Sequence, residues 1–131
     1  MDAGRVLVVD DDTAMAELLV MALAKHGFRV RLAGSAVDAV ELARALDPHV
    51  VILDLHLANG EMPDGHDLGL MLRMQSKRFV QLIVLTADDR FSAHARTDVL
   101  GFAAHLVKPV PLRDLVRLIE LLVPWARGPA S

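Results

Sequence analysis

Near its N-terminus the chain reads Val6-Leu7-Val8-Val9-Asp10-Asp11-Asp12, a short apolar run that ends abruptly in three carboxylates. The run does not alternate with polar residues and is mostly β-branched, which is typical of a strand buried on both faces of a parallel sheet. Two similar runs follow, Val50-Val51-Ile52-Leu53 and Leu82-Ile83-Val84-Leu85. Because helix-length segments separate the runs, their repetition favours strands over pieces of buried helix.

The segments between these runs carry helical periodicity and helix-ending signals. Asp12 or Thr13 is a candidate N-cap of the first helix and Gly27 its stop, while Ser35 and Asp38 resemble a capping pair. Helices are expected over about 13–26, 35–46, 67–74, 92–100 and 111–123, with further strands over 28–33 and 103–107. Strand–helix alternation repeated five times predicts a doubly wound α/β sheet with right-handed crossovers.

Composition narrows the class of protein. The 131 residues suit one domain, expected over 1–123, followed by a tail or truncated linker over 124–131. There are no cysteines, which excludes a disulfide framework, a thiolate metal site and cysteine catalysis. The net charge of −3 gives no nucleic-acid footprint, and the apolar runs are too short to span a bilayer. We therefore expect a cytoplasmic domain that binds neither nucleic acid nor membrane.

Chemically active side chains follow the apolar runs. The first run ends in Asp10-Asp11-Asp12, the second in Asp54 and the third in Thr86, and Lys108-Pro109 follows the last expected strand. In an open α/β sheet, ligands bind beyond the carboxyl ends of the strands, so these groups should converge there. Clustered carboxylates repel one another by ~4 kcal/mol at a separation of ~4 Å and therefore need a cation or raised pKa values. Oxygen ligands without histidine or cysteine favour Mg²⁺.

Each of these residues also has a plainer interpretation. The aspartate triplet could be an acidic run at a helix N-terminus, Lys108 a surface lysine and Thr86 a strand-end cap. Taken together they instead describe a phosphoryl-transfer site. A carboxylate would be the nucleophile, the cation and Lys108 would neutralise phosphoryl oxygens, and Thr86 would donate a hydrogen bond.

Four motifs at strand ends resemble those of the receiver domain of two-component response regulators, the CheY-like family. They are Val8-Val9-Asp10-Asp11-Asp12, Leu53-Asp54-Leu55, Leu85-Thr86-Ala87 and Val107-Lys108-Pro109, and the resemblance runs from about Arg5 to Val123. It implies a flavodoxin-like (βα)5 sandwich with five parallel strands in the order 2-1-3-4-5.

The resemblance also implies a phosphoacceptor and a metal site. Asp54 would accept the phosphoryl group. Asp11, Asp54 and the backbone carbonyl of His56 would hold Mg²⁺, with Asp10 acting mostly through water and with Mn²⁺ as a substitute ion. His56 and Asp88 would occupy positions that tune hydrolysis of the acyl phosphate.

On the other side of the phosphoryl group, the resemblance implies a switch. Thr86, the Ala87 amide and Lys108 would contact the phosphoryl oxygens, and Lys108–Pro109 would be a cis peptide. His105 stands where the family has an aromatic switch residue. The coupled shift of Thr86 and His105 would remodel the face made by the segments 92–100, 103–107 and 111–123.

Two departures from the family pattern stand out. Ala58 replaces a proline and Gly65 lies eleven positions after Asp54 instead of eight, so residues 58–64 look like a three-residue loop expansion that could alter access of a kinase or phosphatase. His105 replaces Tyr or Phe, either as a tolerated substitution or as a pH-sensitive or weaker switch. The other histidines, His26, His49, His66 and His94, show no metal-ligand spacing and are expected at the surface or at helix ends.

The expected function is a phosphorylation-dependent signalling switch, with no enzymatic activity beyond self-directed phosphoryl transfer and autodephosphorylation. Its expected partners are a sensor histidine kinase or phosphotransfer protein and a downstream effector or fused output domain, with the chain as a monomer or a phosphorylation-dependent homodimer.

Three other functions compete with this one. A degenerate receiver could act only as an interaction module. A haloacid-dehalogenase-type phosphatase normally has a second Asp two positions after its nucleophile, where this chain has His56. A flavodoxin-like FMN carrier needs a hydroxyl-rich phosphate loop where this chain has three carboxylates.

Overall fold

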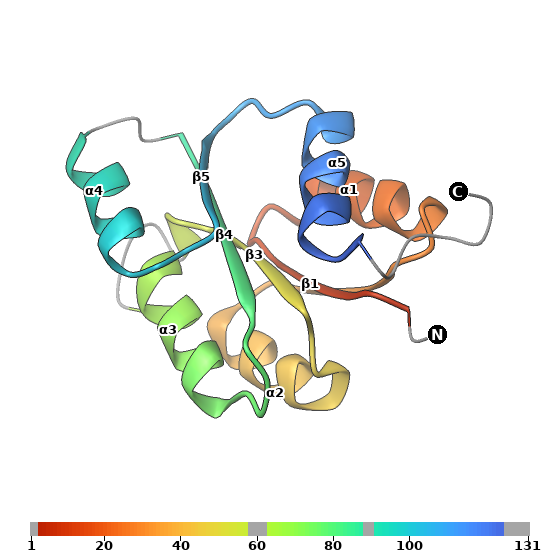
Figure 1. The fold of residues 1–131 in the computed structure, drawn as a ribbon, viewed down its shortest axis with the longest axis horizontal. Coiled ribbons are helices and arrows are strands. Elements are labelled where there is room, and N and C mark those ends of the chain that lie inside the picture. Colours follow the sequence, from red (N-terminus) through yellow and green to blue (C-terminus); the bar gives the residue numbers. More distant parts are fainter. Residues whose placement is uncertain (1–2, 58–62, 88–90, 125–131) are drawn as a thin grey trace.

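The computed structural model describes residues 3–57, 63–87 and 91–124, with the backbone alone for 91–94. In this part of the chain five strands alternate with five helices (Figure 1). In chain order the elements are β1 Arg5–Val9, α1 Thr13–Lys25, β2 Arg29–Ala33, α2 Ala36–Leu46, β3 Val50–Asp54, α3 Gly65–Gln75, β4 Gln81–Thr86, α4 Phe91–Val99, β5 Ala104–Val107 and α5 Leu112–Leu122. The strands form one parallel sheet in the order β2-β1-β3-β4-β5, which confirms the predicted doubly wound fold.

The three apolar runs are the central strands β1, β3 and β4, and both faces of each are covered. Residues 6–9 are at most 2% exposed. Alternate strand residues enter two separate cores: Leu7 and Leu53 pack with α2 and α3, whereas Val6 and Ile52 pack with α1 and α5. Figure 1 shows α1 and α5 on one side of the sheet and α2 and α3 on the other. This two-sided burial explains why the runs do not alternate with polar residues.

The predicted helix ends agree with the structure at α1 and α2. The Asp12 carboxylate accepts a hydrogen bond from the Met15 amide (3.4 Å), and Ser35 Oγ accepts one from the Asp38 amide (3.2 Å). Gly27 follows α1 with a φ of 91°, in the left-handed region that favours glycine.

Helix α3 begins two residues earlier than predicted. Asp64 and Asp67 form a capping box, in which each carboxylate accepts from the other residue's amide (2.9 and 3.1 Å). This pair fixes Gly65 as the first helical residue. Residues 58–62 of the expected loop expansion, Asp88 and residues 125–131 of the expected tail lie outside the described residues. Among the helices described, none combines the length and apolar character needed to cross a bilayer.

Candidate active site at the carboxyl edge of the sheet

Backbone hydrogen bonds continue past the strand ends and hold the site residues at one edge of the sheet. The Asp10 amide donates to the Ala33 carbonyl (3.0 Å), and the Lys108 amide donates to the Thr86 carbonyl (2.7 Å). The Leu55 amide, directly after Asp54, donates to the Leu85 carbonyl of β4 (2.9 Å). The residues that follow β1, β3, β4 and β5 are therefore fixed by the sheet itself, which is the placement that the sequence predicted.

Three carboxylates meet at this edge. One oxygen from each of Asp10, Asp11 and Asp54 lies within 4.8 Å of the other two. Asp10 is 8% exposed, Asp54 is half-buried and Asp11 faces solvent. A hollow of about 420 Å³ lies beside the cluster, between α1 and the start of α5, and Asp10, Asp54 and Lys108 are among its lining residues. The cluster is thus buried on one side and accessible on the other.

The electrostatics of Asp10 show that the cluster carries more negative charge than the protein compensates. Burial raises the pKa of the Asp10 carboxyl above its usual value, and the neighbouring charges of Asp54 and Asp11 raise it further. The Asp12 amide, which donates to Asp10 Oδ1 at 2.9 Å, and the Lys108 ammonium act in the opposite direction. The net effect is a raised pKa, so ionised Asp10 lacks sufficient compensation.

Among the described residues, Lys108 is the cation that lies against the carboxylate cluster. Its Nζ lies 3.6 Å from Asp10 Oδ2 and 3.8 Å from Asp54 Oδ2. One ammonium against three carboxylates leaves an excess of negative charge at an accessible cluster of hard oxygen donors. That donor set fits a divalent cation of the Mg²⁺ type, which takes few carboxylates and keeps several water ligands.

The remaining predicted residues surround the cluster. The His56 amide donates to Asp54 Oδ1 (3.1 Å), while the His56 side chain is exposed. Thr86 is completely buried at the end of β4, and Ala87 after it is exposed. The Lys108–Pro109 peptide bond is cis. The Asp54 carboxylate therefore has the His56 amide on one oxygen and the Lys108 ammonium near the other.

The family is decided by comparison with known proteins. The model of the response regulator receiver domain matches residues 6–120. The chain belongs to this family. It is a regulatory receiver domain of the CheY-like type, not a classical enzyme.

The relatives of this receiver domain are longer proteins. The transcriptional regulatory protein PdtaR of Mycobacterium tuberculosis is 34% identical over 120 residues, which cover 91% of this chain and 56% of PdtaR. The DNA-binding transcriptional regulator NtrC of Bradyrhizobium sp. is 32% identical over 91% of this chain and 24% of NtrC. The chain therefore spans about half or less of these curated relatives.

Solved structures share the fold. A CheY-like receiver domain protein from Methanospirillum hungatei superposes with a TM-score of 0.82 at 24% identity, over 94% of this chain and 96% of the other. A response regulator from Burkholderia pseudomallei, described with a phosphorylated aspartic acid, calcium ion and citrate, gives 0.77 at 25% identity, over 94% of this chain and 73% of the other.

In this receiver domain His105 does not stand alone. It is half-buried on β5, and its Nδ1 lies 2.6 Å from Thr97 Oγ1 of α4. The same hydroxyl lies 2.6 Å from Nε2 of His66 in α3. The sequence offered no signal for this cluster, because its members are far apart in the chain and belong to no motif.

The prediction that the remaining histidines lie at the surface or at helix ends is wrong for His49, which is buried between α2 and β3. His66 does lie at a helix end, as the second residue of α3, but it is buried there. His66 is 1% exposed and packs edge-on against Phe102, with ring centroids 5.4 Å apart. His49 is 8% exposed, and its Nδ1 accepts a hydrogen bond from the Arg5 amide (3.0 Å). His26 ends α1 and is exposed, as predicted, whereas the side chain of His94 is outside the described part. A histidine with one satisfied ring nitrogen can be buried, which spacing alone does not reveal.

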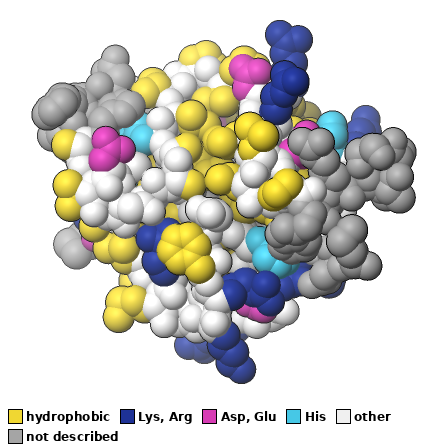
Figure 2. Space-filling view, in the orientation of Figure 1, with side chains coloured by type: hydrophobic (Ala, Val, Ile, Leu, Met, Phe, Trp, Pro, Cys, Tyr) yellow, Lys and Arg dark blue, Asp and Glu magenta, His cyan; other side chains and the backbone are white. Residues whose placement is uncertain are grey.

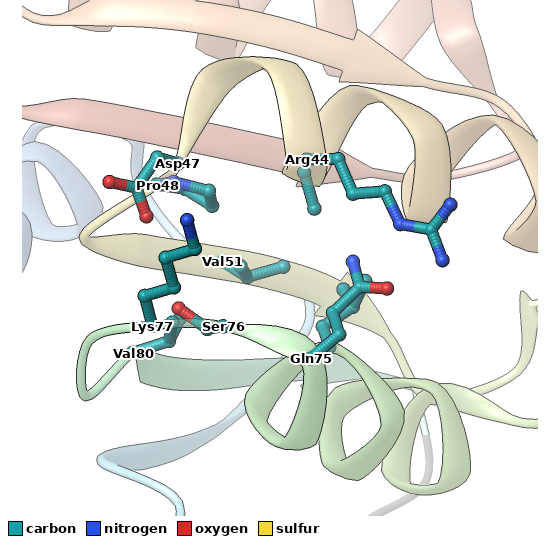
Figure 3. Close-up of a pocket in the computed structure, with 10 residues that line it drawn as sticks. Arg44, Asp47, Pro48, Val51, Gln75, Ser76, Lys77 and Val80 are labelled. Carbon is teal, nitrogen blue, oxygen red and sulfur yellow. The ribbon is translucent and has the colours of Figure 1, made fainter.

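The receiver domain has a second hollow at the opposite edge of the sheet, between the C-terminal ends of α2 and α3. Its volume is about 390 Å³ and its floor is apolar. Figure 3 shows that the head groups of Arg44 and Lys77 lie at different ends of this hollow, with Lys77 near Asp47. The two cations do not converge on one point, so the hollow lacks the focused charge of the carboxylate cluster.

Proposed function

We propose that this receiver domain is a phosphorylation-dependent signalling switch in which Asp54 accepts a phosphoryl group from a sensor histidine kinase or a phosphotransfer protein. The observation that carries the proposal is the convergence of Asp10, Asp11 and Asp54 within 4.8 Å, opposed by Lys108. The phosphorylated aspartic acid and calcium ion described for the Burkholderia response regulator support it by analogy.

In the proposed reaction a carboxylate oxygen of Asp54 attacks the phosphorus of a phosphohistidine. A new P–O bond forms and the P–N bond breaks, with its electron pair going to the ring nitrogen. The imidazole leaves neutral because its other ring nitrogen already carries a hydrogen. Asp11, Asp54 and the backbone carbonyl of His56 would hold Mg²⁺ or Mn²⁺, with Asp10 acting mostly through water. The ion would supply positive charge to the phosphoryl oxygens. Lys108, at 3.8 Å from Asp54, supplies the second positive charge from the protein.

Once Asp54 is an acyl phosphate, its carboxylate charge has moved outward onto the phosphoryl oxygens. Lys108 then pairs with those oxygens, and the Thr86 hydroxyl and Ala87 amide, both at the end of β4, donate to them. Thr86 pairs with Val107 of β5, and His105 lies two positions earlier on the same strand. His105 would respond to Thr86 as the switch side chain. His56 and Asp88 would set how quickly water hydrolyses the acyl phosphate.

The proposed output surface is the face made by α4, β5 and α5. Figure 2 shows hydrophobic side chains gathered over the region between β5 and α5. Val107, Leu112 and Leu121 on these elements are 37%, 42% and 65% exposed. An apolar surface of this kind suits a downstream effector, a fused output domain or a second copy in a phosphorylation-dependent homodimer.

The proposed docking surface for the phosphodonor lies on α1. Met15 and Leu18 are 63% and 51% exposed, and Met15 lines the hollow beside Asp54. A helical phosphodonor seated on this apolar side would bring its phosphohistidine to the open side of the carboxylate cluster.

The proposal is tested by incubating the protein with Mg²⁺ and acetyl phosphate, and separately with beryllofluoride. The expected results are a mass increase of one phosphoryl group that Asp54→Asn abolishes and a spectral change with beryllofluoride. Asp38→Asn, at an exposed carboxylate on α2, is the matched control and should label normally. No labelling of the wild type would favour the degenerate receiver, and labelling of Asp54→Asn would overturn the site. Sustained turnover of phosphomonoesters would favour the phosphatase instead.

A further inference from the structure

Three polar side chains from three elements, two of them buried and one half-buried, form a continuous hydrogen-bonded chain, which we call the His–Thr–His chain. It runs from His66 Nε2 to Thr97 Oγ1 (2.6 Å) and from Thr97 Oγ1 to His105 Nδ1 (2.6 Å). His66 and Thr97 are each 1% exposed. In Figure 1 the helices α3 and α4 and the strand β5, which supply the three residues, are neighbours at the edge of the sheet. The His–Thr–His chain therefore joins α3 and α4 to β5, the strand that carries the proposed switch residue His105.

The chemistry of the Thr97 hydroxyl restricts the protonation of both rings. A hydroxyl has one hydrogen, so it can donate to only one of the two imidazole nitrogens that face it. At least one of those nitrogens must therefore carry a hydrogen and donate to the hydroxyl. At 2.6 Å a mismatch, with two lone pairs facing the oxygen, would repel. The same Thr97 hydroxyl therefore constrains the orientation and the tautomer of both His66 and His105.

The same first turn of α3 rests on the backbone of the proposed phosphoacceptor. A β-carbon at Gly65 would lie 2.6 Å from the Asp54 carbonyl oxygen and 2.7 Å from the Leu55 α-carbon. The Gly65 amide also donates to the Leu55 carbonyl (3.0 Å). His66 directly follows Gly65, so a displacement of the Asp54–Leu55 backbone also displaces the end of the His–Thr–His chain that His66 forms.

A second set of contacts fastens α4 to this turn from the outside. Arg96, which precedes Thr97, pairs with Asp64 (3.1 Å) and with Asp67 (2.9 Å) of the α3 capping box. Thr97 inside and Arg96 outside therefore bind α4 to the first turn of α3 on both sides. Helix α4 is therefore bound to the first turn of α3, and that turn packs against the Asp54 backbone.

We propose that His66 and Thr97 are positioning residues that hold His105 and α4 in the arrangement that the structure shows and transmit changes at Asp54 to the output surface through the first turn of α3. The proposal rests on the proposed function of Asp54 and deepens it. It adds a connection through α3 to the one expected through Thr86. A phosphoryl group that shifts the Asp54 backbone would strain this chain, and loss of the chain would release α4 and His105 together.

Thr97→Val tests the proposal because it removes the hydroxyl and keeps the shape, and Thr97→Ser is the matched control that keeps the hydroxyl. The readouts are the ring-nitrogen resonances of His66 and His105, hydrogen exchange of α4 amides, and beryllofluoride affinity in Mg²⁺. For Thr97→Val we expect shifted resonances of both rings, faster exchange of α4 and beryllofluoride binding roughly 5-fold tighter. Thr97→Ser should restore all three to wild-type values.

His66→Leu provides an independent approach from the other end of the chain. If both residues act through one chain, the double variant His66→Leu/Thr97→Val should resemble either single variant instead of showing the sum of their effects. Unchanged His105 resonances and unchanged beryllofluoride affinity in Thr97→Val would overturn the proposal. So would a double variant whose effects simply add.

The two proposals fail in different ways. A wild-type protein that neither labels at Asp54 nor binds beryllofluoride overturns the proposed function. Even then, the ring-nitrogen resonances of His105, compared between the wild type and Thr97→Val without beryllofluoride, decide whether Thr97 positions His105. A wild-type protein that labels normally, beside a Thr97→Val variant that behaves identically in every readout, overturns only the positioning role.

Discussion

Gly65 packs directly against the backbone of Asp54, so closely that a β-carbon at position 65 would lie 2.6 Å from the Asp54 carbonyl oxygen. No flexible side-chain end is involved, because the nearest atoms are all backbone. The first turn of α3 and the proposed phosphoacceptor therefore cannot move independently at this point.

Gly65→Ala is expected to destabilise the protein by roughly 1–3 kcal/mol despite the better helix propensity of alanine, because the new methyl group must displace backbone. Gly34→Ala is the matched control, since its β-carbon would meet only Thr13 Cγ2 at an ordinary 3.5 Å. Urea unfolding of both variants measures the difference. Equal stability of the two variants would contradict the close contact at Gly65.

The same contact bears on the loop expansion predicted after Asp54. The glycine lies eleven positions after Asp54 instead of eight, yet it occupies a place against the Asp54 backbone that only glycine can fill. The sequence could indicate that the loop is longer. It could not indicate that Gly65 keeps this contact, because the contact depends on where the Asp64–Asp67 capping box starts α3.

Asp10→Asn is expected to stabilise the protein in EDTA by roughly 1 kcal/mol, because it removes a buried charge from beside Asp54 and Asp11. Burial raises the pKa of Asp10, so the ionised form costs stability once the pH exceeds the unfolded value near 3.8, and this cost is fully present above the raised pKa of the folded protein. The same variant should weaken Mg²⁺ binding about tenfold. Thermal unfolding with EDTA and with MgCl₂ measures both effects.

The exposed Glu41→Gln on α2 serves as the control for a lost carboxylate and should change neither quantity. If Asp10→Asn were less stable than the wild type in EDTA, the carboxylate cluster would not be the source of electrostatic strain that its pKa indicates.

How far the sequence predicts this molecule depends on the range of the interactions. The strands follow from two-sided burial, which leaves non-alternating runs such as Val50–Leu53, and the site follows because parallel strands end at one edge. His66 lies at a helix end, as the sequence allowed, but its burial to 1% exposure was not predicted, because it depends on a hydroxyl of α4, distant in the chain, that satisfies its Nε2. Such pairings are invisible without the tertiary packing that creates them.

Arg73 provides another example of a contact that only the fold reveals. From the C-terminal half of α3 its guanidinium donates to the carbonyls of Val80 (3.0 Å), Leu100 (3.4 Å) and Gly101 (3.5 Å), and it lies 4.7 Å from the centre of the Phe79 ring. Arg73→Lys is expected to cost roughly 1–2 kcal/mol, because one ammonium cannot bridge both loops and stack on the ring. Urea unfolding checks this, with the exposed Arg44→Lys as control. Equal losses in the two variants would mean that the fork of hydrogen bonds contributes nothing.

The pH dependence of stability should report on His66. Burial lowers the pKa of His66 below its usual 6.5, and Arg96 on α4 and His105 on β5 lower it further, while Asp64 and Asp67 on α3 oppose them. The unfolded chain therefore binds a proton near pH 6.5 that the folded protein takes up only at lower pH, so stability is complete above about pH 6.5 and is lost as the pH falls below it. Urea unfolding at pH 7.5 and pH 5.5 should show a smaller loss for His66→Gln, which keeps a donor near Nε2 but does not titrate. His26→Gln, at the exposed end of α1, should retain the wild-type loss. A His66→Gln variant that loses as much stability as the wild type would show that the buried ring is not the group responsible.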